Sequence, residues 1–212
     1  PSAPILAHIH EEKGRVFLTT TNLESKESAE RELFRIEKVI HIDWSPDGRN
    51  IAFGGVRAGQ SDVYVYNTLA GSQVALWEDP WDDLQPDWLP DGSGLVFSSN
   101  RPDGWDTLPP WPVPVSRDLW LFSIEEKRFE RITDTPQADE VQPQSLGSGR
   151  FAYRKSQELS TLSLAIRDSA ILRVDTAVHY RYFTRTTPWL KLDRPALSFS
   201  IQQGSEVCGA HT

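Results

Sequence analysis

The chain has 212 residues, a formal net charge of −8 and 38% hydrophobic residues. This length and composition suit a folded chain with a core of its own, and the negative charge disfavours nucleic acid or an anionic membrane as a partner. No window approaches the roughly 18 apolar residues of a membrane-spanning helix, and a single cysteine, Cys208, excludes an internal disulfide.

A repeated stretch organises the chain. Residues 41–53 (HIDWSPDGRNIAF) recur as residues 85–97 (QPDWLPDGSGLVF), with every position offset by 44 residues. In each copy Pro-Asp-Gly has the chemistry of a β-turn, and the apolar run that follows has that of a short buried strand. The recurrence predicts a protein built from structural repeats.

Four related passes are expected along the chain, each with a lead-in segment, a turn and further strands. Their predicted strands cover residues 14–20 and 32–37; 48–54, 62–67 and 71–77; 94–99, 118–125 and 128–133; and 149–153, 161–167 and 170–174. The polar stretch 24–32 is interpreted as a solvated loop. In the strand 62–67, Val63 and Val65 alternate with Tyr64 and Tyr66, which is typical of a strand packed between two neighbouring units.

Units of four short antiparallel strands, about 40–45 residues each, have the size of propeller blades. The sequence therefore predicts an all-β fold, a β-propeller with about four to five blades in this chain. Residues 1–175 are assigned to the blades. Residues 176–212 lose the motif and form a divergent C-terminal segment: a last blade, a closing strand or a tail. Within it, 178–183 and 189–200 are candidate strands and 204–212 is interpreted as a tail.

The longest irregular stretch runs from residue 100 to residue 117 and is rich in proline, which disfavours a ladder strand. Two interpretations stay open. It is either a surface insertion between strands or a tryptophan-bearing lip over a binding mouth, because long loops on rigid scaffolds often carry function. The loop aromatics expected to contact a partner are Trp81, Trp105 and Trp111.

The repeat resembles the TolB-like, WD40-like (PD40) propeller family. The resemblance is carried by Trp44-Ser-Pro-Asp-Gly48 with Asp62-Val-Tyr-Val65, and by Trp88-Leu-Pro-Asp-Gly92 with Asp118-Leu-Trp-Leu121. The first and fourth passes depart from the motif. A six-bladed ring of this family needs more residues than this chain has. Three options follow: a segment of a larger propeller, a ring completed by a partner's blades, or a small five-bladed ring.

By this resemblance, the residues before each Trp-x-Pro-Asp-Gly turn feed the innermost strand near the mouth of the central channel. Such a polar, negative rim suits a cationic peptide segment or a metal ion. The plainer interpretation is that these residues cap turns and solvate loop ends. The candidate ligand- or partner-binding residues are His41, Asp43, Asp82, Asp83, Gln85, Asp139, Glu140 and Gln142.

Other chemistry is weakly indicated. His8 and His10 share a strand face but lack a third metal ligand, and Asp79, Asp82 and Asp83 lack the order of a calcium loop. No cofactor is expected, with calcium left open as an alternative. Nucleophile-elbow, phosphate-loop and zinc-protease motifs are absent from the sequence. Whether the protein is an enzyme stays open, with the balance against it.

The resemblance implies a non-catalytic scaffold that binds a protein or peptide in the bacterial periplasm or at the cell envelope. The alternatives are the non-catalytic propeller of a peptidase, which gates or positions substrate, and a carbohydrate-active propeller. The chain begins at Pro1, without Met, which favours a processed or truncated form.

Overall fold

The repeated turn joins two strands of one hairpin in the computed structural model of the protein. Strand β4 (Lys38–Trp44) ends where the turn begins, and β5 (Asn50–Arg57) follows it. The Ser45 hydroxyl donates to the Asp47 carboxylate at 2.6 Å, and Asp47 accepts the backbone N–H of Arg49 at 3.0 Å. Gly48 supplies the left-handed conformation that the turn needs, with φ of 69°. These bonds lower the pKa of the Asp47 carboxyl.

The structure describes residues 4–102, 116–136 and 138–158, together with strands at 161–167, 178–179, 199–203 and 206–210. Its strands form three four-stranded antiparallel sheets, one three-stranded sheet and one hairpin. The three-stranded sheet comprises β1 (Ile5–Glu12), β2 (Arg15–Asn22) and β3 (Ser28–Glu32). The four-stranded sheets are β4–β5–β6 (Gln60–Asn67)–β7 (Ser72–Ala75); β8 (Asp83–Trp88)–β9 (Gly94–Ser99)–β10 (Asp118–Ser123)–β11 (Arg128–Arg131); and β12 (Asp139–Gly147)–β13 (Arg150–Glu158)–β14 (Thr161–Arg167)–β15 (Val178–His179). The hairpin pairs β16 (Phe199–Gln203) with β17 (Glu206–Ala210).

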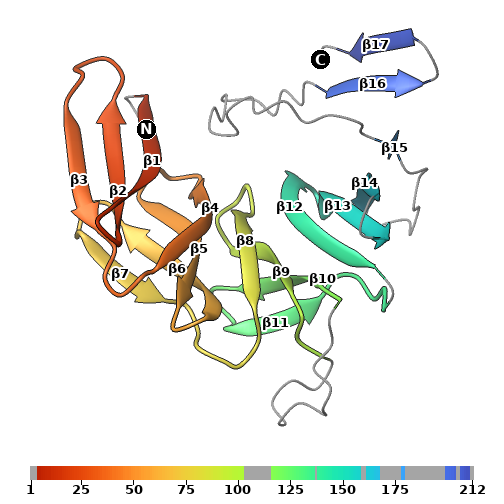
Figure 1. Cartoon of the computed structure of the whole chain (residues 1–212), viewed down its shortest axis with the longest axis horizontal. Helices are drawn as coiled ribbons and strands as arrows, with labels where there is room; N and C mark the ends of the chain where they lie inside the picture. The colour runs from red at the N-terminus through yellow and green to blue at the C-terminus, as the bar shows by residue number, and fades with distance from the viewer. Residues whose placement is uncertain are drawn as a thin grey trace.

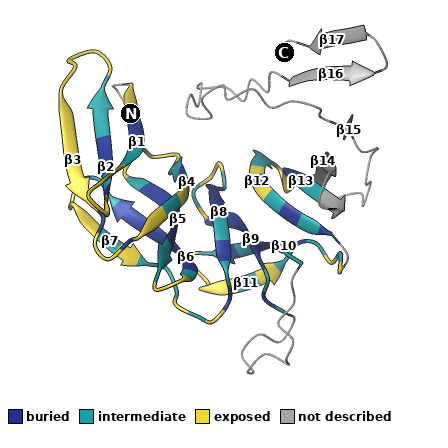
Figure 2. Ribbon diagram, in the orientation of Figure 1, coloured by how far each residue is buried: buried dark blue, intermediate teal, exposed yellow. Residues whose placement is uncertain are grey.

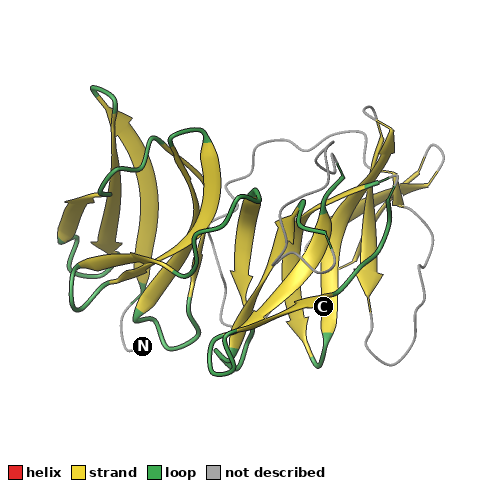
Figure 3. Ribbon diagram, turned by 90° about the horizontal axis from the view of Figure 1, so that it is seen from below, coloured by secondary structure: helices red, strands yellow, loops and turns green. Residues whose placement is uncertain are grey.

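The four sheets follow one another along an arc (Figure 1), with β4, β8 and β12 on its inner side and β7 and β11 on its outer side. Figure 3 shows the same sheets from below, as successive layers of strands. The predicted all-β propeller architecture with four-stranded blades is confirmed. Among the described strands, hydrogen-bonded pairing stays within each sheet. The predicted channel-mouth residues therefore lie along the inner edge of an arc.

The core lies between the sheets, and Figure 2 shows buried residues concentrated where the sheets face one another. Tyr64 and Tyr66 of β6 pack in one cluster with Val16 and Leu18 of the first sheet. Val65 packs with Trp88 and Leu95, and Val63 packs with Phe97 and Trp120, all from the third sheet. The expected alternation in β6 is confirmed, because its two faces serve two neighbouring blades.

Two local predictions are wrong. The stretch 24–32 was predicted as a loop, but residues 28–32 form the exposed strand β3. The stretch 32–37 was predicted as a strand, but residues 33–37 form the turn that leads to β4. β3 is exposed throughout because it is the outer strand of its sheet, so polarity on both faces does not exclude it from the ladder.

The C-terminal prediction also needs correction, because residues 206–210, expected in a tail, form β17. The fourth sheet reaches residue 179, slightly past the predicted blade boundary at 175. The predicted outer strand at 170–174 lies outside the described residues.

Candidate functional site

The inner strands β4, β8 and β12 each carry a β-bulge or similar irregularity in their first half. The register shifts between Val39 and His41, between Leu84 and Asp87, and between Val141 and Gln144. At two of these bulges a glutamine has positive φ, 57° at Gln85 and 54° at Gln142. A bulge re-aims side chains and frees backbone groups from the ladder. The inner strands can therefore bond across blades here.

A repeated bond joins neighbouring blades along the inner strands. The carboxylate of Asp43 in β4 accepts the backbone N–H of Trp88 in β8 at 2.8 Å. The equivalent carboxylate of Asp87 in β8 accepts the backbone N–H of Ser145 in β12, also at 2.8 Å. Asp87 is 9% exposed. Asp43, predicted as a partner-binding residue, therefore serves as a joint between blades.

A second repeated position behaves in the same way. Gln85 accepts the backbone N–H of Gln142 at 2.8 Å through its side-chain oxygen, which ties β8 to β12. Gln142, in turn, accepts a hydrogen bond from the Arg154 guanidinium at 2.6 Å. Gln142 is exposed, and His41, at the matching position of β4, is partly exposed. Of these three predicted rim residues, Gln85 forms a hydrogen bond that joins two blades.

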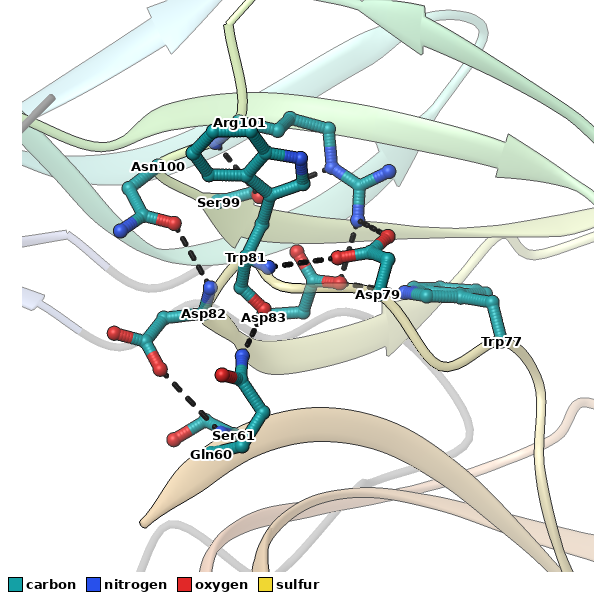
Figure 4. A network of polar contacts seen from close by, with 10 residues as sticks. All are labelled: Gln60, Ser61, Trp77, Asp79, Trp81, Asp82, Asp83, Ser99, Asn100 and Arg101. Carbon is teal, nitrogen blue, oxygen red and sulfur yellow. Dashed lines mark hydrogen bonds and ion pairs between the residues drawn. The ribbon is translucent and has the colours of Figure 1, made fainter. Parts of the chain in front are cut away.

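A polar network surrounds the buried side chain of Arg101, just after β9 (Figure 4). Its guanidinium bonds to the carboxylates of Asp79 and Asp83, with 3.1 Å to the former, and its Nε bonds to Ser99 at 3.0 Å. The indole N–H of Trp77 donates to the same Asp83 carboxylate. Within the described residues, the rings of Trp77, Phe97, Trp120 and Phe129 lie beside the guanidinium, with the centre of the Phe129 ring 4.1 Å away.

Burial of this network shifts the ionisation of its acids. Desolvation raises the pKa of Asp83 to about 6, although the nearby Arg101 opposes the shift. Desolvation and the charges of Asp83, Asp79 and Glu78 raise the pKa of Asp62 to about 7. Asp83 is 0% exposed and Asp62 is 5% exposed, so neither forms an open rim. Asp83, predicted to bind a partner, instead forms part of a buried ion-pair network.

The next blade has a simpler version of this arrangement. Glu140 lies opposite Lys155 on the neighbouring strand, and their side chains form an ion pair at 3.2 Å. Glu140 also accepts a hydrogen bond from the Thr135 hydroxyl at 2.6 Å. Its side chain is 0% exposed. The predicted rim residue Glu140 is therefore also buried.

Two predicted acids remain at the surface, where the connections enter the inner strands. Asp82 accepts the backbone N–H of Ser61 at 3.3 Å, and Asp139 accepts that of Arg117 at 2.9 Å. Their side chains are 37% and 38% exposed. The Arg117 guanidinium lies 4.0 Å from the second oxygen of each. The structure thus brings these acids of two successive blades to the same arginine.

The tryptophans predicted to contact a partner are not found at an exposed surface within the described residues. Trp81, expected to contact a partner, is 0% exposed, because the connection between β7 and β8 folds it inward. Trp105 and Trp111 lie outside the described residues. Arg101 was not singled out by the sequence analysis, although its place two residues after the predicted strand 94–99 puts a charge beside a buried strand.

The metal predictions find little support in the geometry. His8 and His10 lie on one face of β1 with ring centroids 6.0 Å apart, as the spacing predicted. Within the described ranges, no group of three or more histidine, cysteine or acidic side chains is arranged to hold a metal ion. Asp79 and Asp83, two of the acids considered for calcium, already bind the Arg101 cation. The described part of the chain also contains no helix long and apolar enough to cross a membrane.

No protein-family model matches this chain. Curated proteins match parts of it. An uncharacterized protein of Agrobacterium fabrum is 27% identical over 96 residues, 45% of this chain and 29% of that protein. The uncharacterized peptidase YuxL of Bacillus subtilis is 34% identical over 62 residues, and dipeptidyl-peptidase 5 of Porphyromonas gingivalis is 31% identical over 75. These matches cover 29% and 31% of this chain but only 9% and 11% of the peptidases.

Solved structures match a larger part of the chain. TolB of Acinetobacter baumannii superposes with a TM-score of 0.59 at 16% identity, over 84% of this chain and 43% of that one. A candidate TolB of Agrobacterium tumefaciens gives 0.54 at 14% identity, over 80% and 78%. A puromycin-hydrolyzing peptidase of Mycobacterium tuberculosis gives 0.59 at 14% identity, over 81% and 27%. At these identities the likeness establishes the fold alone: the chain has a TolB-like β-propeller fold.

Proposed function

We propose that this chain is a non-catalytic propeller module that binds a protein or peptide partner. The observation that carries the proposal is the placement of Asp82 and Asp139 on either side of Arg117, at the blade ends. One carboxylate oxygen of each acid accepts a backbone N–H, and the other oxygen lies 4.0 Å from the Arg117 guanidinium. Both acid side chains are partly exposed. Such a contact is too long for a direct hydrogen bond. A basic side chain of a partner therefore has two fixed carboxylates to approach.

The fold supports the same proposal. The solved structures that resemble this chain include TolB and parts of peptidases. The resemblance to TolB supports a location in the bacterial periplasm or at the cell envelope. Cell fractionation of the natural host, with an antibody against this chain, tests that location. Recovery with cytoplasmic markers alone contradicts it.

A peptide array tests the binding. Purified wild-type protein is applied to immobilised peptides that differ in net charge, alongside the double variant Asp82→Asn, Asp139→Asn. Asparagine keeps the oxygen that accepts the backbone N–H but removes the charge, so the fold is preserved. Basic peptides are expected to bind the wild type and to lose at least about tenfold in affinity with the variant, as for a lost bond between charged groups. Equal binding by both proteins contradicts the proposal.

A second function is favoured by the partial matches to two peptidases. In that case the chain is the non-catalytic propeller of a longer peptidase, and the same acids position a peptide substrate. Sequencing the gene on both sides of the region that encodes residues 1–212 separates the two. A hydrolase domain in the same reading frame favours the peptidase, whereas its absence favours the independent binding module.

A further inference from the structure

A second polar surface lies at the junction of the first two sheets. A pocket of about 480 Å³ opens between the β1–β2 turn, the connection 33–37 and the β5–β6 turn. This connection has five residues, whereas those that lead into β8 and β12 have seven each, 76–82 and 132–138. The longer connections place buried Trp81 and Ala138 just before their inner strands. The pocket lies where the short connection has no such additional residues.

The wall formed by the short connection is firmly held. Leu33 donates its backbone N–H to Val16 and Glu37 donates its own to Val56, both at 2.8 Å. Leu33 is 2% exposed and Ile36 is 4% exposed, so the segment is anchored in the core on both sides of its tip. This wall is therefore ordered before any ligand arrives.

The tip itself is clamped by an outer strand of the second blade. The Gln73 side chain accepts the backbone N–H of Phe34 at 3.0 Å and donates to the Phe34 carbonyl at 3.1 Å. The tip residue Arg35 has φ of 57°, a left-handed conformation that turns the chain sharply. Because its neighbours are fixed, the direction of the Arg35 backbone is fixed as well. A preorganised residue loses less freedom when it binds.

The pocket is locally basic on an acidic chain. Its lining includes Arg15, Arg35 and Arg57, against only two acids, Glu32 and Glu37. Arg15 pairs with Glu32 at 3.2 Å. Glu37 accepts the backbone N–H of Ala58 at 2.8 Å, which uses part of its acceptor capacity inside the protein. The lining itself therefore carries one guanidinium more than it has carboxylates, and Glu78 pairs with Arg57 from outside the lining at 3.2 Å.

Arg35 differs from the other two arginines in its partners. Arg15 pairs with Glu32 and Arg57 pairs with Glu78, each at 3.2 Å. Among the residues that the structure describes, no carboxylate forms an ion pair with the Arg35 guanidinium, which lies 5.0 Å from the centre of the Phe34 ring. Phe34 is 68% exposed. An exposed aromatic ring beside an available guanidinium offers both an apolar and an anionic contact.

We propose that this pocket binds the carboxylate of an acidic peptide segment. Arg35 takes the carboxylate in the planar, two-bonded geometry that guanidinium favours, and Phe34 packs against a neighbouring apolar side chain of the same peptide. The surface is distinct from the acidic pair Asp82 and Asp139, and it recognises the opposite charge. The proposal therefore stands whether or not basic peptides bind at that pair.

Three peptide sets test it against the full chain by fluorescence anisotropy. The first is a set of labelled hexapeptides with blocked ends and a central glutamate between apolar residues; the second replaces glutamate by glutamine. The third keeps glutamine but leaves the C-terminal carboxylate free. Tighter binding of the first or the third set than of the second is expected, and which one binds identifies a side-chain or a terminal carboxylate. Equal binding of all three sets, or of none, overturns the proposal.

Matched variants locate the contact. Arg35→Gln is expected to weaken binding of the carboxylate peptide at least about tenfold, the loss typical of a hydrogen bond to a charged group. Arg49→Gln is the control, because Arg49 is an exposed arginine in the turn at the opposite end of the same blade. Thermal unfolding of both variants shows that each is folded. Wild-type affinity in Arg35→Gln, or an equal loss in Arg49→Gln, places the ligand elsewhere.

Discussion

Asp43 accepts the backbone N–H of Trp88 across two blades at 2.8 Å, and the Asp87–Ser145 pair repeats this bond at the next junction. If these are joints, replacing either acid by alanine leaves a backbone N–H without its acceptor. Asp43→Ala and Asp87→Ala are each expected to lower the free energy of unfolding by about 1–3 kcal/mol. Urea unfolding measures the loss. Glu126→Ala, an exposed turn position, is the control and is expected to change little.

Arg101 is a buried cation between two carboxylates, so its removal leaves buried negative charge without compensation. Arg101→Met is expected to cost about 3–5 kcal/mol of stability at pH 8. The loss should be smaller at pH 5, because burial already raises the pKa of Asp83 to about 6 and loss of the cation raises it further. Unfolding curves at both pH values test this. A cost independent of pH contradicts the electrostatic explanation.

The raised pKa of Asp62 has a structural cause in the neighbouring strand. In the third blade the equivalent Asp118 pairs with Arg131 at 2.6 Å, and Arg131 lies opposite Trp120. In the second blade Tyr64 occupies the position of Trp120, and the residue opposite it is Ala75, which carries no charge. Asp62 is therefore buried without the arginine that its counterpart has.

The raised pKa of Asp62 makes the free energy of unfolding fall as the pH rises. The pKa of Asp62 is about 7 in the folded chain and about 3.9 when unfolded, so the folded state binds more protons between those values. This contribution to stability is present at acidic pH and is lost as the pH rises from about 4 to about 7. Asp62→Asn is expected to remove that dependence and to stabilise the chain at pH 8 by roughly 2–4 kcal/mol. No gain at pH 8 contradicts it.

Gly94 lies at the start of β9, where a Cβ atom would come within 2.3 Å of the Phe122 carbonyl oxygen. The contact is to backbone, which cannot move aside without disturbing the sheet. Gly94→Ala is expected to cost about 1–3 kcal/mol, as for overpacking of a core. Gly59→Ala meets no atom within 4 Å and isolates the cost of its positive φ of 79°. A loss in Gly94→Ala that is no larger than ordinary surface changes contradicts the clash.

The blades were predictable because their signals are local and repeated. The turn chemistry around Gly48 and the alternation in β6 each depend on a few adjacent residues. β3 was missed because an exposed outer strand needs no apolar face. The roles of Asp43 and Gln85 were missed because their partners, Trp88 and Gln142, are distant in the chain. Their recurrence at equivalent repeat positions was itself a signal of a structural role.

The proposed partner binds at the blade ends that carry Asp82 and Asp139. The most direct measurement is a ¹⁵N NMR titration of the whole chain with the best basic peptide from the array. The backbone amides of Ser61 and Arg117, which donate to these two carboxylates, are predicted to shift most. Amides in the turns at Gly48 and Gly92, at the opposite ends of the blades, are predicted to stay unchanged. Shifts confined to those turns, or no shifts at saturating peptide, would contradict the claim.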